Sequence, residues 1–94
     1  MNFEWDDLKD QLNFKKHGVH FAEAATALYD PNAIQIKDFD SDKKEERFVV
    51  IGYSVKSKIL VVVYTIREYV GRTESYRIIS ARKANKQEQK QYEE

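Results

Sequence analysis

The segment RFVVIGYSVKSKILVVVYTIR, residues 47–67, gives the strongest indication of the fold of this chain. Two runs rich in Val, Ile and Tyr, residues 47–55 and 58–67, are separated by the short polar turn KSK. β-Branched and aromatic residues favour strands, and sequential strands with a short link pair antiparallel. The stretch therefore predicts a β-hairpin.

Two further strands flank this hairpin. AIQIKDF, residues 33–39, alternates apolar and polar residues and precedes the charged loop DSDKKEE. SYRIISAR, residues 75–82, follows the polar connection EYVGRTE, in which Gly71 provides the turn. Together the four strands predict an antiparallel meander sheet.

Two helices are expected before the strands and one after them. Trp5, Leu8 and Leu12 recur at helical spacing in residues 5–16, and a second apolar stripe runs through residues 21–29 before the helix-ending Asp-Pro pair. Residues 83–94 form a charged helix whose only clearly apolar side chains are Ala84 and Tyr92. We therefore expect one α+β domain over residues 1–94, in which the N-terminal helices cover one face of the sheet.

Composition excludes several classes of protein. There is no cysteine, so a disulfide framework or a thiolate metal site is impossible, and a cytoplasmic location fits. The longest apolar run, residues 59–64, is too short to span a membrane, and the acidic N-terminus does not resemble a signal peptide.

Charge is unevenly distributed along the chain. Residues 1–46 hold eleven acidic and six basic residues, whereas residues 47–94 hold five acidic and ten basic ones. This split indicates either a basic working surface in the C-terminal half or chance scatter over a solvated surface.

The basic residues of the C-terminal half are candidates for binding phosphate. Lys83, Lys86 and Lys90 fall at helical spacing and form one stripe, and arginines occur at positions 67, 72, 77 and 82. Arginine matches phosphate oxygens with its planar fork, and lysine adds a movable point charge. The alternative is a solvated helix stabilised by its own charge pairs. Strict alternation puts Arg77 and Arg82 on opposite faces of their strand unless a bulge intervenes.

Few residues are suited to proton transfer. His17 can act as a general base or acid, or can simply interact with the end of a helix, and Glu46 can serve as a base or merely solvate a loop. His17 and His20 lie on either side of Gly18 and have no partner at metal spacing, so we predict no metal site and no cofactor.

Three ordered blocks resemble the BrnT family of bacterial toxins: FEWDDLKDQLNFKKHGVHFAEAA, EERFVVIGYS and RIISARKANKQEQKQYEE. The resemblance covers essentially the whole chain. Two departures stand out: His20 occupies a position where a serine or threonine helix cap is usual, and the connection around residues 65–75 is longer than usual, with Ile66 where an acid is common.

The resemblance implies a fold similar to RelE and ParE and a ribonuclease that stops translation without using a metal. It also implies neutralisation by a BrnA-like ribbon-helix-helix antitoxin, in a heterotetramer in which only the antitoxin binds DNA. The candidate catalytic residues are then Arg67, Arg77, Arg82, Glu46 and His17, and the candidate RNA-binding residues are Lys16, Arg47, Arg72, Lys83, Lys86 and Lys90. In this hypothesis the arginines hold the scissile phosphate, and Glu46 or His17 handles the proton. The alternative function is a non-catalytic module that binds an antitoxin or a nucleic acid through its basic C-terminal strand and helix.

Overall fold

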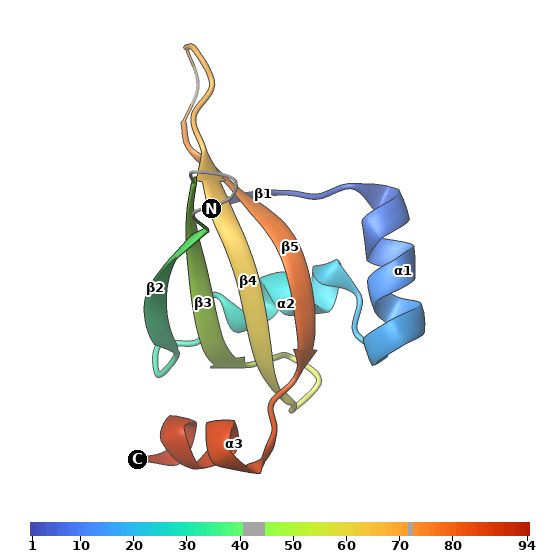
Figure 1. The fold of residues 1–94 in the computed structure, drawn as a ribbon, viewed down its shortest axis with the longest axis vertical. Coiled ribbons are helices and arrows are strands. Elements are labelled where there is room, and N and C mark those ends of the chain that lie inside the picture. The colour runs from blue at the N-terminus through green and yellow to red at the C-terminus, as the bar shows by residue number, and fades with distance from the viewer. Residues whose placement is uncertain (41–44, 72) are drawn as a thin grey trace.

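The computed structural model describes residues 1–40, 45–71 and 73–94. Its elements follow in the order β1 (Asn2–Glu4), α1 (Asp7–His17), α2 (Phe21–Ala27), β2 (Ile34–Asp40), β3 (Glu45–Tyr53), β4 (Ile59–Arg67), β5 (Ser75–Lys83) and α3 (Lys86–Glu93). Figure 1 shows α2 behind the sheet, α1 beside β5, and α3 beneath the lower end of the strands. The expected α+β class is confirmed.

The sheet has five strands in the order β1-β5-β4-β3-β2. The predicted hairpin forms its centre, with Ile51 opposite Val61, and β2 to β5 make the expected antiparallel meander. The prediction of a purely antiparallel four-stranded sheet is wrong, because β1 pairs parallel to β5, with Glu4 opposite Arg77. Three residues are too few to show an alternating pattern, so only the neighbouring strand reveals β1.

The main core lies between α2 and the sheet. Phe21, Ala24, Ala25 and Ala27 of α2, with Val19 before it, pack on Leu60, Val62, Ile78 and Ala81 of β4 and β5. The alanines allow a close approach, and the carbonyl oxygen of Ala27 lies directly over Gly52 of β3. The stripe predicted for the second helix is therefore confirmed.

The apolar stripe predicted for the first helix is wrong. Leu8 and Leu12 are 64% and 57% exposed, and the buried residue of α1 is Asn13. The Asn13 amide donates to the carbonyl oxygens of Val19 and Ala81, and its own oxygen accepts from the Ala81 N–H. Because α1 lies beside β5 and does not cross the sheet, the hydrogen bonds of Asn13 attach it to β5. Its leucines remain exposed to solvent.

The start of α2 is capped by a neighbouring helix. His20 occupies the N-cap position without a side-chain bond to the helix. Instead, Asp10 of α1 accepts a hydrogen bond from the Phe21 N–H at 2.7 Å, and the His20 ring stacks on Phe14 with a centroid distance of 3.9 Å. Asp10 thus supplies the acceptor that an N-cap serine or threonine usually provides.

We call the sheet face opposite α2 the open face. A second apolar cluster at its lower end joins Ile51, Val61 and Ala84 with Tyr92 of α3. The two apolar residues of the C-terminal segment are thus both used to hold α3 against the sheet. No helix in the described part of the chain is long and apolar enough to cross a membrane.

Candidate active site on the open face of the sheet

A bulge in β5 turns its two arginines to the same side. Val63 lies opposite Ser80 and Tyr64 opposite Ile78, so Ile79 is an extra residue without a direct partner on β4. Ala81 and Ile78, three residues apart, consequently both enter the core under α2. Arg82 and Arg77, on the opposite pleats, therefore both belong to the open face.

Arg67 and Arg77 are neighbours at the upper end of this face. Arg77 lies opposite Thr65 and Arg67 lies opposite Ser75, so the two arginines are diagonal neighbours about 7–8 Å apart. The half-buried Arg47 precedes Phe48 on β3. Because Phe48 pairs with Tyr64 on the α2 side of the sheet, Arg47 points to the open face. Thr65 is only 4% exposed, and no described residue provides a hydrogen-bond partner for its hydroxyl oxygen. A buried hydroxyl thus lies on the same face as these arginines, opposite Arg77 and two positions before Arg67.

Glu4 and Tyr69 adjoin these arginines, and neither was expected from the sequence. Arg77 donates to Glu4 Oε2 at 2.8 Å, and the Tyr69 hydroxyl lies 2.7 and 2.9 Å from the two oxygens of the same carboxylate. The Tyr69 hydrogen bond, helped by bonds from Ser75 and Arg77 and opposed by burial, lowers the pKa of Glu4. The same bond raises the pKa of Tyr69. The signal that could have indicated this pair is β1 itself, which the sequence pattern does not reveal.

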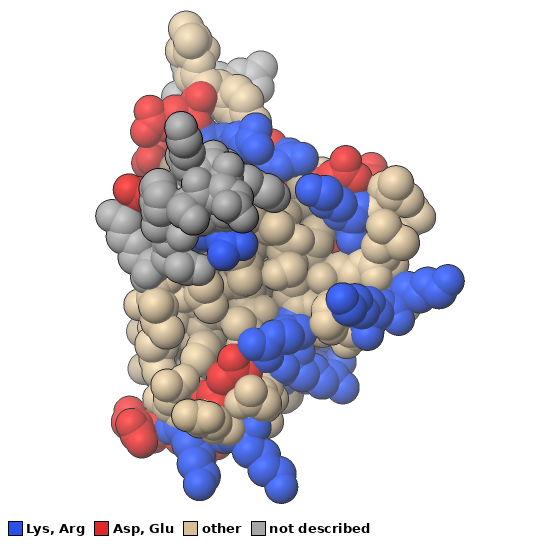
Figure 2. All heavy atoms as spheres, viewed as in Figure 1, with Lys and Arg blue, Asp and Glu red and all other residues tan. Residues whose placement is uncertain are grey.

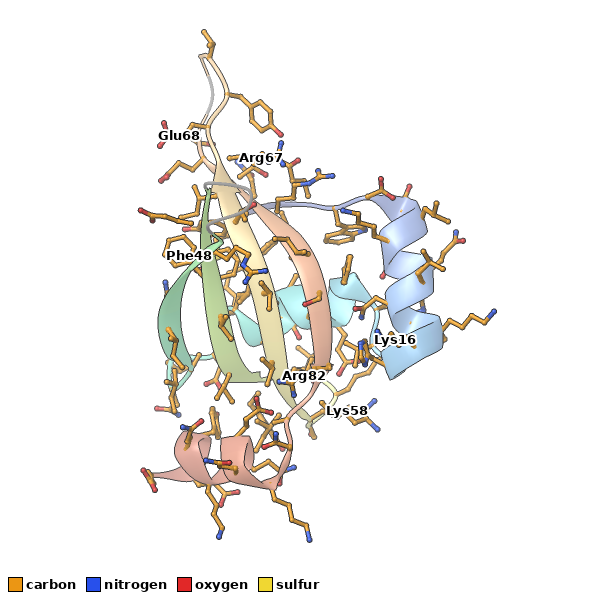
Figure 3. All side chains as sticks on the ribbon, viewed as in Figure 1. Lys16, Phe48, Lys58, Arg67, Glu68 and Arg82 are labelled. Atoms are coloured by element: carbon orange, nitrogen blue, oxygen red, sulfur yellow. The ribbon has the colours of Figure 1, made fainter. Side chains whose placement is uncertain are left out.

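Arg82 is not brought together with Arg67 and Arg77. It lies opposite Val61, six positions from Arg67 along β4, or about 20 Å. Figure 3 shows Arg67 and Arg82 at opposite ends of the strands. The guanidinium of Arg82 instead donates to both oxygens of Glu88 of α3, at 2.7 and 2.8 Å. The three predicted arginines therefore cannot hold one phosphate together in this conformation.

Glu46 and His17 also lie apart from each other. Glu46 lines a hollow of about 470 Å³ at the upper end of β3 and β4, together with Arg67, Glu68 and other residues. By alternation its side chain leaves β3 on the face opposite to that of Arg47. His17 ends α1, one turn beyond Asn13, which contacts β5 near its lower end. Of the two predicted proton carriers, only Glu46 shares a hollow with a predicted arginine.

The predicted RNA-binding lysines lie at the periphery. Lys16 is exposed on α1, Lys83 ends β5, and Lys86 and Lys90 are exposed on α3. Figure 2 shows basic side chains at the upper end of the sheet, over α1 and over α3, with acidic ones interspersed. Arg72 lies outside the described residues. In the described part of the chain, no three Asp, Glu, His or Cys side chains group as a metal site requires.

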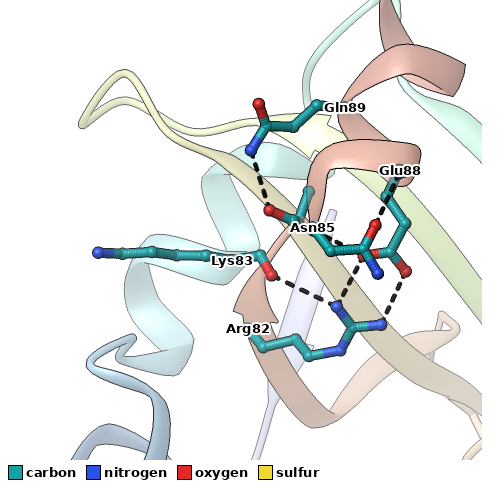
Figure 4. A network of polar contacts seen from close by, with 6 residues as sticks. Arg82, Lys83, Asn85, Glu88 and Gln89 are labelled. Carbon is teal, nitrogen blue, oxygen red and sulfur yellow. Dashed lines mark hydrogen bonds and ion pairs between the residues drawn. The ribbon is translucent and has the colours of Figure 1, made fainter.

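Two carboxylates fasten α3 to the sheet. Glu88 accepts from Arg82 and from the Asn85 N–H, and the Asn85 side chain accepts from the Glu88 N–H, which completes a capping box (Figure 4). At the other end of the helix, the Tyr92 hydroxyl donates to Asp30. The Arg82 bond, despite burial, lowers the pKa of Glu88. Burial opposes ionisation of Asp30, but bonds from Tyr92, Asn32 and Tyr53 outweigh it and lower the pKa of this carboxyl.

Acid is therefore expected to release α3. A carboxyl whose pKa is lower in the folded state stabilises the fold fully above its ordinary pKa, which is 4.5 for Glu88 and 3.8 for Asp30. That stabilisation disappears as the pH falls through the lower folded values. We expect the NMR signals of α3 to move toward random-coil positions below pH 4.5 before those of β4 do. Glu88→Gln should loosen α3 already at neutral pH, and signals of α3 and β4 that change together on acidification would contradict this assignment.

Comparison with known proteins agrees with this architecture. Residues 5–88 match the family model described as ribonuclease toxin, BrnT, of type II toxin-antitoxin system. The crystal structure of the Brucella abortus ribonuclease toxin BrnT is similar, with a TM-score of 0.67 and 27% sequence identity over 92% of this chain and 99% of that one. No curated protein sequence matches the chain. Because the family model spans almost all of the residues, and the similar crystal structure covers both chains nearly end to end, this chain belongs to the BrnT family of ribonuclease toxins of type II toxin-antitoxin systems.

Proposed function

We propose that this chain cleaves RNA without a metal ion, and that Arg67 and Arg77 hold the scissile phosphate. The observation that supports this most strongly is the bulge at Ile79, which leaves both arginines as neighbours on the open face. Cleavage of RNA through its 2′-hydroxyl needs cations that stabilise the charge developing on the phosphate. Two permanently charged guanidinium groups supply such charge, and their flat forks match phosphate oxygens.

The other predicted residues take supporting places in this proposal. Arg47 lies on the same face and can extend the basic surface along an RNA strand. The lysines at positions 16, 83, 86 and 90 contribute long-range attraction to RNA. Arg82 bonds to Glu88 of α3, so in this proposal it holds the helix and leaves the phosphate to Arg67 and Arg77. Glu46 stays a candidate base because it shares a hollow with Arg67.

RNA cleavage in the presence of EDTA tests the proposal. The purified protein should cut RNA in EDTA at the rate measured with added Mg²⁺, and it should stop protein synthesis in a cell-free translation reaction. RNA that stays intact in every buffer and on ribosomes would overturn the proposed activity. Cleavage that EDTA abolishes and Mg²⁺ restores would overturn the metal-independent mechanism alone.

The partner proposed for this toxin is a BrnA-like antitoxin that assembles with it into a heterotetramer. Membership of a type II toxin family implies an antitoxin. The exposed Leu8 and Leu12, one turn apart on α1, provide an apolar surface for such a protein, whereas α3 uses its apolar residues internally. The second candidate function, a non-catalytic module that binds through its basic C-terminal strand and helix, would use a different surface from this one.

Co-purification separates the two possible antitoxin surfaces. Leu8→Glu with Leu12→Glu should abolish capture of a co-expressed antitoxin if α1 is the binding surface. If the C-terminal segment is the binding surface, deletion of residues 83–94 should abolish capture of the antitoxin. Capture that survives both changes would overturn both assignments.

A further inference from the structure

The upper end of the open face contains a second hollow, of about 670 Å³, beside Arg77. Asn2, Glu4, Tyr69, Thr73 and Ser75 line it. Asn2 and Glu4 come from β1 and lie opposite Ser75 and Arg77 of β5. Two of these lining residues are neighbours of the proposed phosphate site, because Glu4 bonds to Arg77 and Ser75 lies opposite Arg67 on the next strand.

Glu4 is the carboxylate in this hollow that meets an arginine directly. Its bond to Arg77 is 2.8 Å long, and the Tyr69 hydroxyl contacts both of its oxygens. A carboxylate has about four acceptor positions, and the single proton of Tyr69 can serve only one strong bond. Ser75 donates to Glu4 as well, so these three donors leave about one acceptor position of the carboxylate free for a substrate hydroxyl. A second close arginine–carboxylate pair, Arg82 with Glu88, is already occupied by the cap of α3.

We propose that Glu4 is the general base of the RNA cleavage, an inference that rests on the proposed function above. The Glu4 carboxylate takes the proton of the 2′-hydroxyl while the 2′-oxygen forms a bond to phosphorus and the bond from phosphorus to the 5′-oxygen breaks. The departing 5′-oxygen takes a proton from a water molecule, and Glu4 returns its proton to the hydroxide that remains. The products are a 2′,3′-cyclic phosphate and a free 5′-hydroxyl, and no oxidant or reductant is needed.

The groups around Glu4 suit this role. Arg77 and Tyr69 fix the carboxylate beside the phosphate site, which limits the motion needed to reach the transition state. The hydrogen bond from Tyr69, with Ser75 and Arg77, lowers the pKa of Glu4 and so favours the ionised form that a base requires. Tyr69 acts here as a positioning residue, because it acts through Glu4.

If Glu4 had only a structural role, Glu4→Gln would leave the rate of RNA cleavage almost unchanged. Glu4 also ties the edge strand β1 to β5 through Arg77. Glutamine has the same shape as glutamate and can still accept a hydrogen bond from Tyr69, but it cannot take a proton. Glu4→Gln therefore preserves most of the shape of the site and removes the base.

The decisive experiment compares Glu4→Gln with Glu93→Gln, the same change on exposed α3, by kcat/KM on RNA in EDTA. We expect Glu4→Gln to lose activity by about 10²- to 10⁴-fold, as for a general base, and Glu93→Gln to match the wild type. Glu4→Gln activity within a few-fold of the wild type would overturn the proposal while leaving the ribonuclease function intact. A wild type that cuts no RNA would instead refute the function itself.

A second variant tests the role independently of any effect on folding. The Tyr69 side chain is 43% exposed, so Tyr69→Phe should leave the melt unchanged. Without the Tyr69 bond the pKa of Glu4 should rise toward its ordinary value, because that bond is the largest cause of its lowering. The acidic limb of the kcat/KM profile should then move to higher pH. A limb that stays in place would exclude Glu4 as the titrating base.

Discussion

Replacing Arg67 by alanine is expected to lower kcat/KM for RNA cleavage by about 10²- to 10³-fold, the usual cost of removing one group that stabilises developing charge. Arg67 ends β4 on the open face, diagonal to Arg77, and its side chain is exposed. Its loss removes a charge from the proposed phosphate site without opening a cavity in the core. Activity should therefore fall while the melting temperature stays the same.

Three further variants test whether the loss of activity is specific to the guanidinium group of Arg67. Arg67→Lys should restore only part of the activity, because lysine keeps the charge and loses the fork. Lys15→Ala removes an exposed charge from α1 and should cost almost nothing. Arg82→Ala should loosen α3 by breaking its bonds to Glu88 and should affect catalysis far less than Arg67→Ala. An Arg67→Ala enzyme as active as the wild type would remove Arg67 from the phosphate site.

The largest effect on stability is expected from Gly52→Ala. A Cβ atom at this position would lie 2.5 Å from the carbonyl oxygen of Ala27 and 3.3 Å from its carbonyl carbon. Both are backbone atoms of α2, so no side-chain rotation can relieve the clash, and the helix has to move away from the sheet. Overpacking typically costs about 1–3 kcal/mol, and because backbone atoms have to move here, the loss should lie at the upper end, about 3 kcal/mol. In a domain of this size the melting temperature should fall by about 15 °C or more.

Gly18→Ala provides the matched control for this prediction. Gly18 follows α1 as its C-cap with a φ of 73°, and nothing lies within 4 Å of an added Cβ. Its substitution costs only the backbone strain of the left-handed region, about 1–2 kcal/mol. Urea unfolding of the two variants should rank Gly52→Ala as clearly the less stable. Equal losses would mean that α2 can shift away from β3 at little cost.

Much of the fold follows from local pattern. The Val- and Ile-rich runs, the alternation in β2 and the alanine stripe of α2 each indicate the element that forms. The apolar spacing gave a wrong prediction for α1. Leu8 and Leu12 have helical spacing but are exposed, and Asn13 is buried instead. Spacing shows which residues share a helical face, but it does not show which face meets the sheet. That depends on the position of α1 beside β5.

The candidate site was harder to predict from the sequence than the fold. The basic residues and Glu46 are visible in the sequence, whereas Glu4 and Tyr69 are separated from each other by sixty-five positions and meet only because β1 joins β5. The placement of Arg82 does not favour the predicted joint action of Arg67, Arg77 and Arg82, because Arg82 pairs with a carboxylate six residues later.

The hairpin, the helical segments and the family blocks can be predicted from the sequence, because they depend on residues close together in the chain. Which charged side chains meet depends on how the strands pair in three dimensions. One unpaired residue, Ile79, shifts the pairing of β5 against β4 and reverses the pleat of every residue before it. Because register depends on how two strands fit each other, the shared face of Arg67 and Arg77 appears only when both strands are in place.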